Sequence, residues 1–374
     1  MTRQIDSRLR TLAQRRKGGD RLNRVSKEQA VLLAQDGLSI ESWQRRVGTQ
    51  PHTRYTLGAM EAVERRYTEI SIETALRVGS QLQQKLSIPV TLRLQGSVPL
   101  NVHIRGVSDV DLLTLDTRFL RYDPNGLRAS TYGHSPLTST AVLMALRLEE
   151  ERLLRTTFPA AAVDTSGGKA ITIEGGSLAR PVDVVPSHWW DTANYQATQA
   201  EHDRGVYILD KKVPETISNL PFLHIKRVGD ADDAVFGGLR KAIRLTKNVK
   251  NDAENEAAAR KLPSFDIAAL LYHADRNALA LGRGHELAIL GETQRFLDWC
   301  WNNKDAAKRL MTPDGMRTVL NTDAKMEGLR AISVEMDALA REVAREQAPS
   351  LRNLDPSWSQ VDAALRQARI PLAA

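Results

Sequence analysis

Apolar residues recur at steps of three and four along residues 57–86, with one slip, which predicts a long amphipathic helix. The segment Ser87–Pro89 ends this pattern. Alternating polarity predicts a strand over Val90–Leu94, and a continuous apolar run predicts a buried strand over Val110–Leu115. Residues 136–158 return to a helical period, so the first half of the chain mixes strands with helices.

The next segments predict a hairpin and then a change of period. Ala170–Ile173 and Pro181–Val185 have strand composition, and Gly175-Gly176 between them is typical of a turn. A short strand is expected at Val206–Leu209. Beyond residue 214 the pattern is helical, with helices expected at 234–250, 264–282, 284–303 and 323–347 and a shorter one after Asp355. The pattern therefore predicts an α+β fold in which a long helix and a small mixed sheet precede a helical C-terminal lobe.

Composition narrows the class of protein. The 374 residues suffice for two domains. No run of eighteen apolar residues occurs and the N-terminus lacks an apolar signal region, so neither a membrane span nor secretion is expected. The single cysteine, Cys300, excludes an intramolecular disulfide and a cysteine-based zinc site. A reducing cytoplasm fits this composition.

Positive charge is concentrated near the N-terminus. The net charge is +7, which favours anionic partners, and residues 1–25 hold eight Lys/Arg against two Asp. Two interpretations are open: a solvated, frayed helix, or an arm that contacts phosphate or RNA. The absence of interleaved aromatic residues weakens the case for stacking on a single strand.

Three aspartates form the principal candidate site. Asp109 and Asp111 are two apart at the start of a predicted strand, so their side chains share one face. Asp183 lies in the apolar stretch of the hairpin, where a buried acid is difficult to explain without a cation. Three such carboxylates suit two Mg²⁺ or Mn²⁺ ions, which clamp a phosphoryl displacement.

Other residues could hold the phosphates of a nucleotide. Gly96 lets the backbone approach a ligand closely, and Ser97 offers a hydroxyl and an N–H at a possible helix start. Steps of four and three place Arg240, Arg244 and Lys247 on one helix face, which either faces a triphosphate or is solvated. Ser264 can cap the helix that follows it, bind phosphate, or do both.

The residues after the third aspartate have two interpretations. His188, Trp189 and Trp190 either frame a base or pack under the sheet, and packing is favoured. The histidines lack the spacing of a zinc hydrolase.

The ordered set Gln95-Gly-Ser, eleven residues, Asp109-Val-Asp111 and then Asp183 resembles the polymerase-beta-type nucleotidyltransferases. Within them it is similar to the bacterial cyclic-oligonucleotide synthases (CD-NTases), relatives of animal cyclic GMP-AMP synthase and 2′-5′ oligoadenylate synthetase. Residues 240–247 and 261–270 resemble the family segments that supply a triphosphate-binding Lys, a phosphate-binding Ser and a base-stacking Tyr. The resemblance implies these roles for Lys247, Ser264 and Phe265. It covers roughly residues 57–300.

The resemblance implies a two-lobed fold: a basic helical extension over 1–56, a catalytic core over 57–213 and a helical lobe over 214–374 that ends in a short flexible tail. Three positions depart from the family pattern. Phe265 stands where the family usually has Tyr, Ala268 where Glu is common, and Asn101 where Thr often follows the Gly-Ser pair. None of these changes removes a metal ligand. The zinc insertion of the animal DNA sensor is absent, so direct activation by double-stranded DNA is not expected.

The activity expected from this resemblance is the Mg²⁺-dependent condensation of nucleoside triphosphates into a cyclic di- or trinucleotide. The family context implies antiphage signalling through a separate effector, with a regulatory or tail-conjugating partner in some members. Two alternatives remain. The first is transfer of a nucleotide to RNA or protein, which the basic N-terminus supports. The second is a catalytically silent nucleotide- or RNA-binding module. Base identity, linkage and ring size do not follow from the sequence.

Overall fold

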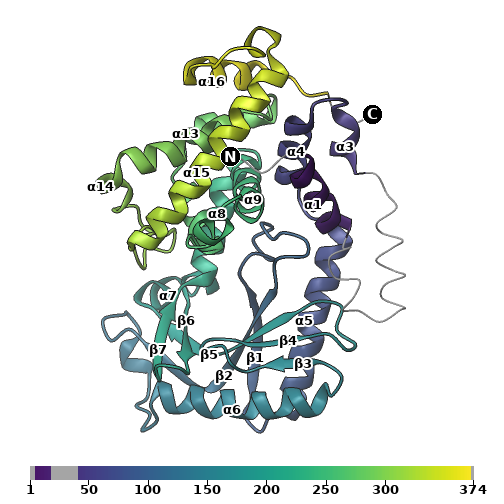
Figure 1. The fold of residues 1–374 in the computed structure, drawn as a ribbon. Coiled ribbons are helices and arrows are strands. Elements are labelled where there is room, and N and C mark those ends of the chain that lie inside the picture. Colours follow the sequence, from purple (N-terminus) through teal and green to yellow (C-terminus); the bar gives the residue numbers. More distant parts are fainter. Residues whose placement is uncertain (1–4, 18–40, 372–374) are drawn as a thin grey trace.

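The structure is a computed structural model that describes residues 5–17 and 41–371. Its sheet and the helix α6 (Ser139–Thr157) lie at one end of the molecule, and the C-terminal helices lie at the other (Figure 1). The predicted two-lobed α+β fold is thereby confirmed. Within the described part, no helix combines the length and apolar character needed to cross a membrane.

The predicted long helix over 57–86 is in fact two helices. α4 (Pro51–Met60) and α5 (Arg65–Lys85) are separated by a short extended segment, in which Glu61 and Glu64 have ψ near 140°. α4 buries its apolar residues in the C-terminal lobe, whereas α5 buries its own against the sheet. The slip in the apolar period falls between Ile70 and Ala75, inside α5, so it does not mark the break between the two helices.

Among the described residues the sheet has seven strands, of which only β2 and β5 pair in parallel. Its path runs β1-β2-β5-β4-β3, with β6 on β5 and β7 on β6. The strands are β1 (Val90–Gln95), β2 (Val110–Tyr122), β3 (Ala162–Asp164), β4 (Ile171–Glu174), β5 (Val182–Asp191), β6 (Gly205–Asp210) and β7 (Glu215–Asn219). The predicted strands and hairpin are confirmed, and Gly175 and Gly176 both have positive φ. The short β3 and β7 were not predicted.

The sheet is covered by α5 and α6, which pack against β2 and against each other. Leu112, Val182 and Val184 belong to the core between them. Leu113 and Val185, which alternate with them along the strands, belong to a second buried cluster. The parallel pair β2–β5 therefore lies inside the sheet with both faces buried.

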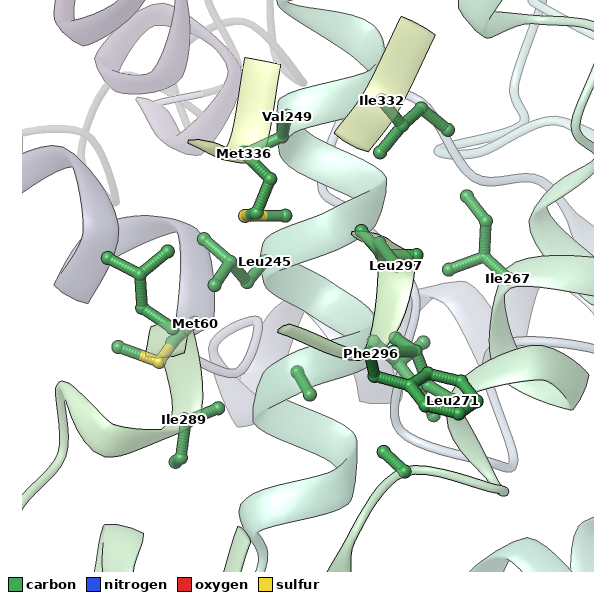
Figure 2. Packing of buried hydrophobic residues seen from close by; sticks show 14 of the residues in the cluster. Met60, Leu245, Val249, Ile267, Leu271, Ile289, Phe296, Leu297, Ile332 and Met336 are labelled. Carbon is green, nitrogen blue, oxygen red and sulfur yellow. The ribbon is translucent and has the colours of Figure 1, made fainter. Parts of the chain in front are cut away.

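The C-terminal lobe is built around α9 (Gly238–Asn251). Figure 2 shows Leu245 and Val249 of this helix among apolar side chains from several others, including Met60 and Met336. The helices around it are α8 (Pro221–Asp233), α10 (Glu256–Ala259), α11 (Ser264–Leu271), α12 (Arg276–Ala280), α13 (Ala288–Asn302), α14 (Lys304–Ala307), α15 (Asp323–Gln347) and α16 (Trp358–Gln367). The prediction for 323–347 is confirmed to the residue. The one expected over 264–282 divides, because Asp275 caps a new helix by accepting from the N–H of Ala278.

The N-terminal helix α1 (Ile5–Lys17) docks on the C-terminal lobe instead of fraying. Arg8 pairs with Glu335, and Arg15 donates to both oxygens of Asp252 at 2.6 and 2.8 Å. Arg16 pairs with Glu41 of the segment before α3 (Ser42–Arg46). These three arginines are buried, so both the solvated and the RNA-contacting interpretation are wrong for them. Arg3, Arg21 and Arg24 lie outside the described residues.

Candidate active site

The three aspartates come together at the amino ends of β2 and β5. Asp109 directly precedes β2, and Asp111 and Asp183 are the second residues of the two parallel strands. In the register of this pair, Asp111 lies opposite Asp183. All three line one cleft with a volume of about 430 Å³. The period-two argument and the neighbouring-strand argument thus lead to a shared site.

The Gly-Ser turn closes over the same carboxylates. β1 runs antiparallel to β2, which places Gln95 across from Asp111. Gly96 has φ of 79°, and a Cβ at this position would collide with Oδ2 of Asp111. A glycine is therefore required both by the backbone and by the aspartate. Gln95, Gly96 and Ser97 all line the cleft, although Ser97 begins a hydrogen-bonded turn and not a helix.

The electrostatics of the acids favour a cation. Burial, followed by the charges of Asp183 and Asp109, raises the pKa of Asp111 to about 7, while Lys247 opposes this rise. Burial also raises the pKa of Asp183. The hydroxyl of Thr172, which donates to Oδ1 of Asp183 at 2.6 Å, lowers this pKa but does not cancel the effect of burial. Positive charge placed between these carboxylates would relieve both effects.

The residues fit a divalent metal chemically, since they offer the oxygen ligands that Mg²⁺ and Mn²⁺ prefer. As the side chains now stand, however, no group of three or more His, Cys, Asp or Glu within residues 5–17 and 41–371 has metal-binding geometry. The carboxylates share a cleft without forming a closed set of ligands.

The basic face of α9 has a role that neither sequence interpretation foresaw. Arg240, Arg244 and Lys247, which we call the α9 clamp, donate to three consecutive backbone carbonyls just after the Gly-Ser turn. The bonds run from Arg240 Nε to Leu100 at 2.9 Å, from Arg244 Nη1 to Asn101 at 2.8 Å and from Lys247 Nζ to Val102 at 2.7 Å. The clamp ties the turn of the N-terminal lobe to the central helix of the other lobe.

Only Lys247 of the clamp also lines the cleft. It is buried, and desolvation followed by the charge of Lys250 lowers its pKa to about 7, while Asp111 works in the opposite direction. A bound anion would restore the charged form of this lysine. The ammonium group is therefore placed where a phosphate could replace the Val102 carbonyl as its acceptor.

Two further predicted residues lie at the opposite wall of the cleft. Ser264 is the first residue of α11 and is exposed; Pro263 takes the N-cap position, so the predicted capping role of Ser264 is wrong. Phe265 is 41% exposed. Its ring stacks on His224, with centroids 4.4 Å apart, so that neighbour occupies part of the surface a base would use.

Several lining residues were not foreseen. Asn219 ends β7, His224 lies in α8, and Asp314 lies in the loop between α14 and α15. No motif links these positions, and the sequence marked only the nearby turns, at Pro221 and Pro313-Asp-Gly315. The three residues could not be predicted because they lie far from the aspartates in the sequence and because β7 was not predicted.

The histidine and tryptophans after Asp183 do not line the cleft. His188 is fully buried, with its Nε2 3.0 Å from Oγ of Ser139, and Trp189 is buried against Phe222. The preferred interpretation, packing under the sheet, is confirmed for these two residues.

Comparison with known proteins places this cleft in a family. Residues 229–339 match the cGAS/DncV-like nucleotidyltransferase C-terminal helical domain. The cyclic dinucleotide synthase CdnE of Yersinia aleksiciae is 42% identical over 353 residues, which cover 91% of this chain and 93% of that protein.

Solved structures share the fold. The STING-associated CdnE c-di-GMP synthase of Capnocytophaga granulosa matches with a TM-score of 0.69 at 25% identity, over 90% of this chain and 97% of that one. The CdnE c-UMP-AMP synthase of Rhodothermus marinus, solved with Apcpp and Upnpp, matches with a TM-score of 0.56 at 18% identity, over 75% of this chain and 93% of that one.

Proposed function

This chain belongs to the cGAS/DncV-like nucleotidyltransferases, and we propose that it condenses two nucleoside triphosphates into a cyclic dinucleotide and releases pyrophosphate. The observation that carries the proposal is the meeting of Asp109, Asp111 and Asp183 in one cleft with Lys247 and Ser264. Of the ring sizes that the sequence left open, the relative with 42% identity favours the dinucleotide.

The reaction is a phosphoryl displacement carried out twice. A ribose hydroxyl of one nucleotide attacks the α-phosphorus of the other, a new P–O bond forms, and the bond to pyrophosphate breaks. A second attack closes the ring. Asp183 is positioned on β5 to accept the proton of the attacking hydroxyl, since it lies beside Asp111 and its pKa is raised.

Two divalent ions complete the proposed site. Asp109, Asp111 and Asp183 would hold them, because these are the carboxylates whose mutual repulsion a cation relieves. When bound, two Mg²⁺ or Mn²⁺ ions activate an attacking hydroxyl and neutralise a leaving pyrophosphate.

The donor triphosphate would lie between the two lobes. Gln95, Gly96 and Ser97 offer the turn on one side, and Lys247 and Ser264 offer an ammonium group and a hydroxyl on the other. Phe265 would contact a base at the exposed part of its ring. Binding thus uses both lobes, and the α9 clamp keeps them in register.

Product analysis tests this proposal. The purified protein is incubated with labelled nucleoside triphosphates and Mg²⁺, and the products are treated with phosphatase and analysed by mass spectrometry. A phosphatase-resistant cyclic dinucleotide is expected, and it should disappear in Asp109→Ala/Asp111→Ala. Label in RNA or protein would instead support transfer to a macromolecule, and equal behaviour of the variant and the unmodified protein would support a silent module.

The N-terminal helix supports RNA transfer less than its basic sequence suggested. Arg8, Arg15 and Arg16 of the basic N-terminus are buried in ion pairs and cannot form a contacting arm. Cyclisation therefore remains the function that the cleft supports best.

We further place the reaction in bacterial antiphage signalling in the cytoplasm, with the product acting on a separate effector. The buried free thiol of Cys300 suits a reducing compartment. A regulatory or tail-conjugating partner stays a proposal, and residues 372–374 at the end of the tail lie outside the described part. Loss of phage protection in cells that carry Asp109→Ala/Asp111→Ala would support this context.

A further inference from the structure

A second, much smaller cavity begins one residue beyond Val102. It lies between α1, the segment 103–105, the junction of α4 with α5, and α9. Its volume of about 10 Å³ is enough for one body the size of a water molecule. The lining residues are Leu12, Arg15, Arg16, Glu61, Val63, His103, Ile104, Arg105, Arg244 and Asn248.

The wall of this cavity is strongly positive. Among the described lining residues four carry a guanidinium group, and Glu61, which is half-buried, is the one carboxylate. The carboxylates that pair with Arg15 and Arg16, namely Asp252 and Glu41, are not part of the wall. Positive groups therefore outnumber negative ones among the lining residues that the structure describes.

Arg105 carries the argument furthest. Its side chain is only 4% exposed, and among the described residues its Nε and Nη2 have no acceptor. Its ion-pair partner, Glu64, is half-exposed and reaches Nη1 at a distance of 3.8 Å. Buried N–H groups of a charged side chain are costly without an acceptor, and Arg105 is one of the residues that line the cavity.

The other basic residues that line the cavity have hydrogen-bond partners outside it or are uncharged near pH 7. Arg244 donates to the carbonyls of Met60 and Asn101 and forms no ion pair with a described carboxylate. Burial and the charges of Lys247 and Arg244 lower the pKa of His103 to about 4, so its ring is neutral near pH 7 and leaves the surplus to the arginines. A water molecule would accept hydrogen bonds here but would leave this surplus in place.

We propose that this cavity binds a monovalent anion of halide size, for which chloride is the available candidate. A single negative sphere accepts N–H groups from several directions and compensates a buried guanidinium group. Phosphate, sulfate and nucleotides are too large for the space. The ion would join α1, the segment that leads to Asp109, and the part of α9 that carries Lys247.

Crystals of the unmodified, full-length protein grown in sodium bromide provide the direct test. An anomalous bromine peak in contact with Arg105 is expected in the cavity. Density without an anomalous signal would identify water and overturn the proposal.

A thermal melt provides the second test. Chloride is titrated against gluconate at constant ionic strength, because gluconate is too large for the cavity. The melting temperature should rise saturably with chloride, by about 2–6 °C. Arg105→Met keeps an unbranched side chain but loses the donors and the guanidinium group that lies over the ring of Tyr67, so its melting temperature should not respond to chloride.

Arg66→Met is the matched control, because Arg66 is an exposed arginine with surface partners. This variant should respond to chloride like the unmodified protein. An equal response in Arg105→Met would overturn the proposal. If that variant does not fold, the bromine peak in the unmodified protein decides the question.

Discussion

The substitution Arg244→Met tests whether the α9 clamp holds the Gly-Ser turn in place. Arg244 is buried, and its guanidinium group donates to Met60 O at 2.7 Å and to Asn101 O at 2.8 Å. Methionine fills a similar path but donates nothing. The carbonyl of Met60 belongs to a buried residue, so leaving it without a donor costs about 1–3 kcal/mol.

Asn101 is exposed, so water can replace the lost donor at its carbonyl. That bond therefore contributes only about 0.5–1.5 kcal/mol. Together the two losses predict a decrease of about 1.5–4.5 kcal/mol in the free energy of unfolding. The turn that carries Gly96 and Ser97 would also loosen, and 1.4 kcal/mol of lost positioning corresponds to about a tenfold fall in kcat/KM.

Urea denaturation measures the stability, and pyrophosphate release under conditions where both proteins are folded measures kcat/KM. Arg66→Met is again the control, because an exposed ion pair contributes at most about 1 kcal/mol. Stability within about 0.5 kcal/mol of the unmodified protein, together with unchanged kcat/KM, would refute the clamp.

Substitutions at three further positions address other parts of the molecule. Asp183→Asn should lower kcat at least about 100-fold, as measured by pyrophosphate release, without lowering the melting temperature, because burial raises the pKa of Asp183; a loss below tenfold would remove Asp183 from the mechanism. Phe265→Ala should cost about 1–3 kcal/mol of base stacking, seen as a raised KM, whereas Phe265→Tyr should retain binding; an unchanged KM in both would contradict the base contact. Burial raises the pKa of the Glu150 carboxyl to about 8, so the folded state binds the carboxyl proton more tightly than the unfolded chain does. The protonated carboxyl therefore contributes its full stability below pH 4.5, and this contribution is lost as the pH rises through 8. Glu150→Gln should therefore stabilise the protein at pH 8.5 by up to about 4 kcal/mol and have little effect at pH 4.5; equal melting shifts at both pH values would contradict this assignment.

The three aspartates of the cleft could be predicted because strand geometry is local. Residues two apart on one strand share a face whatever surrounds them, so Asp109 and Asp111 followed from their spacing. Asp183 followed from its environment, because an acid between valines is unusual without a cation. The family resemblance supplied the rest of the expected cleft, including Lys247 and Ser264. The structure brings all of these residues to one cavity.

What lies opposite a helix face does not follow from its period. Arg240 and Arg244 do share a face with Lys247, but the surface they meet is a row of carbonyls from a segment about 140 residues earlier. The same limit applies to Arg8 and Arg15, whose carboxylate partners lie hundreds of residues away. Long-range partners of charged residues depend on tertiary packing, which local patterns do not encode.

The break between α4 and α5 has a similar origin. Both segments keep a helical period, so the pattern suggests one helix, yet Tyr55 and Val78 are buried in different cores. The slip in the period lies between Ile70 and Ala75, inside α5, so the spacing of apolar residues gave no sign of the break at residues 61–64.

The most direct test of the central claim is a crystal grown with Mn²⁺ and a non-hydrolysable nucleoside triphosphate. The account predicts two anomalous peaks about 3.5–4 Å apart, held by Asp109, Asp111 and Asp183 next to the triphosphate. A triphosphate bound in the cleft with no manganese on these carboxylates would contradict it.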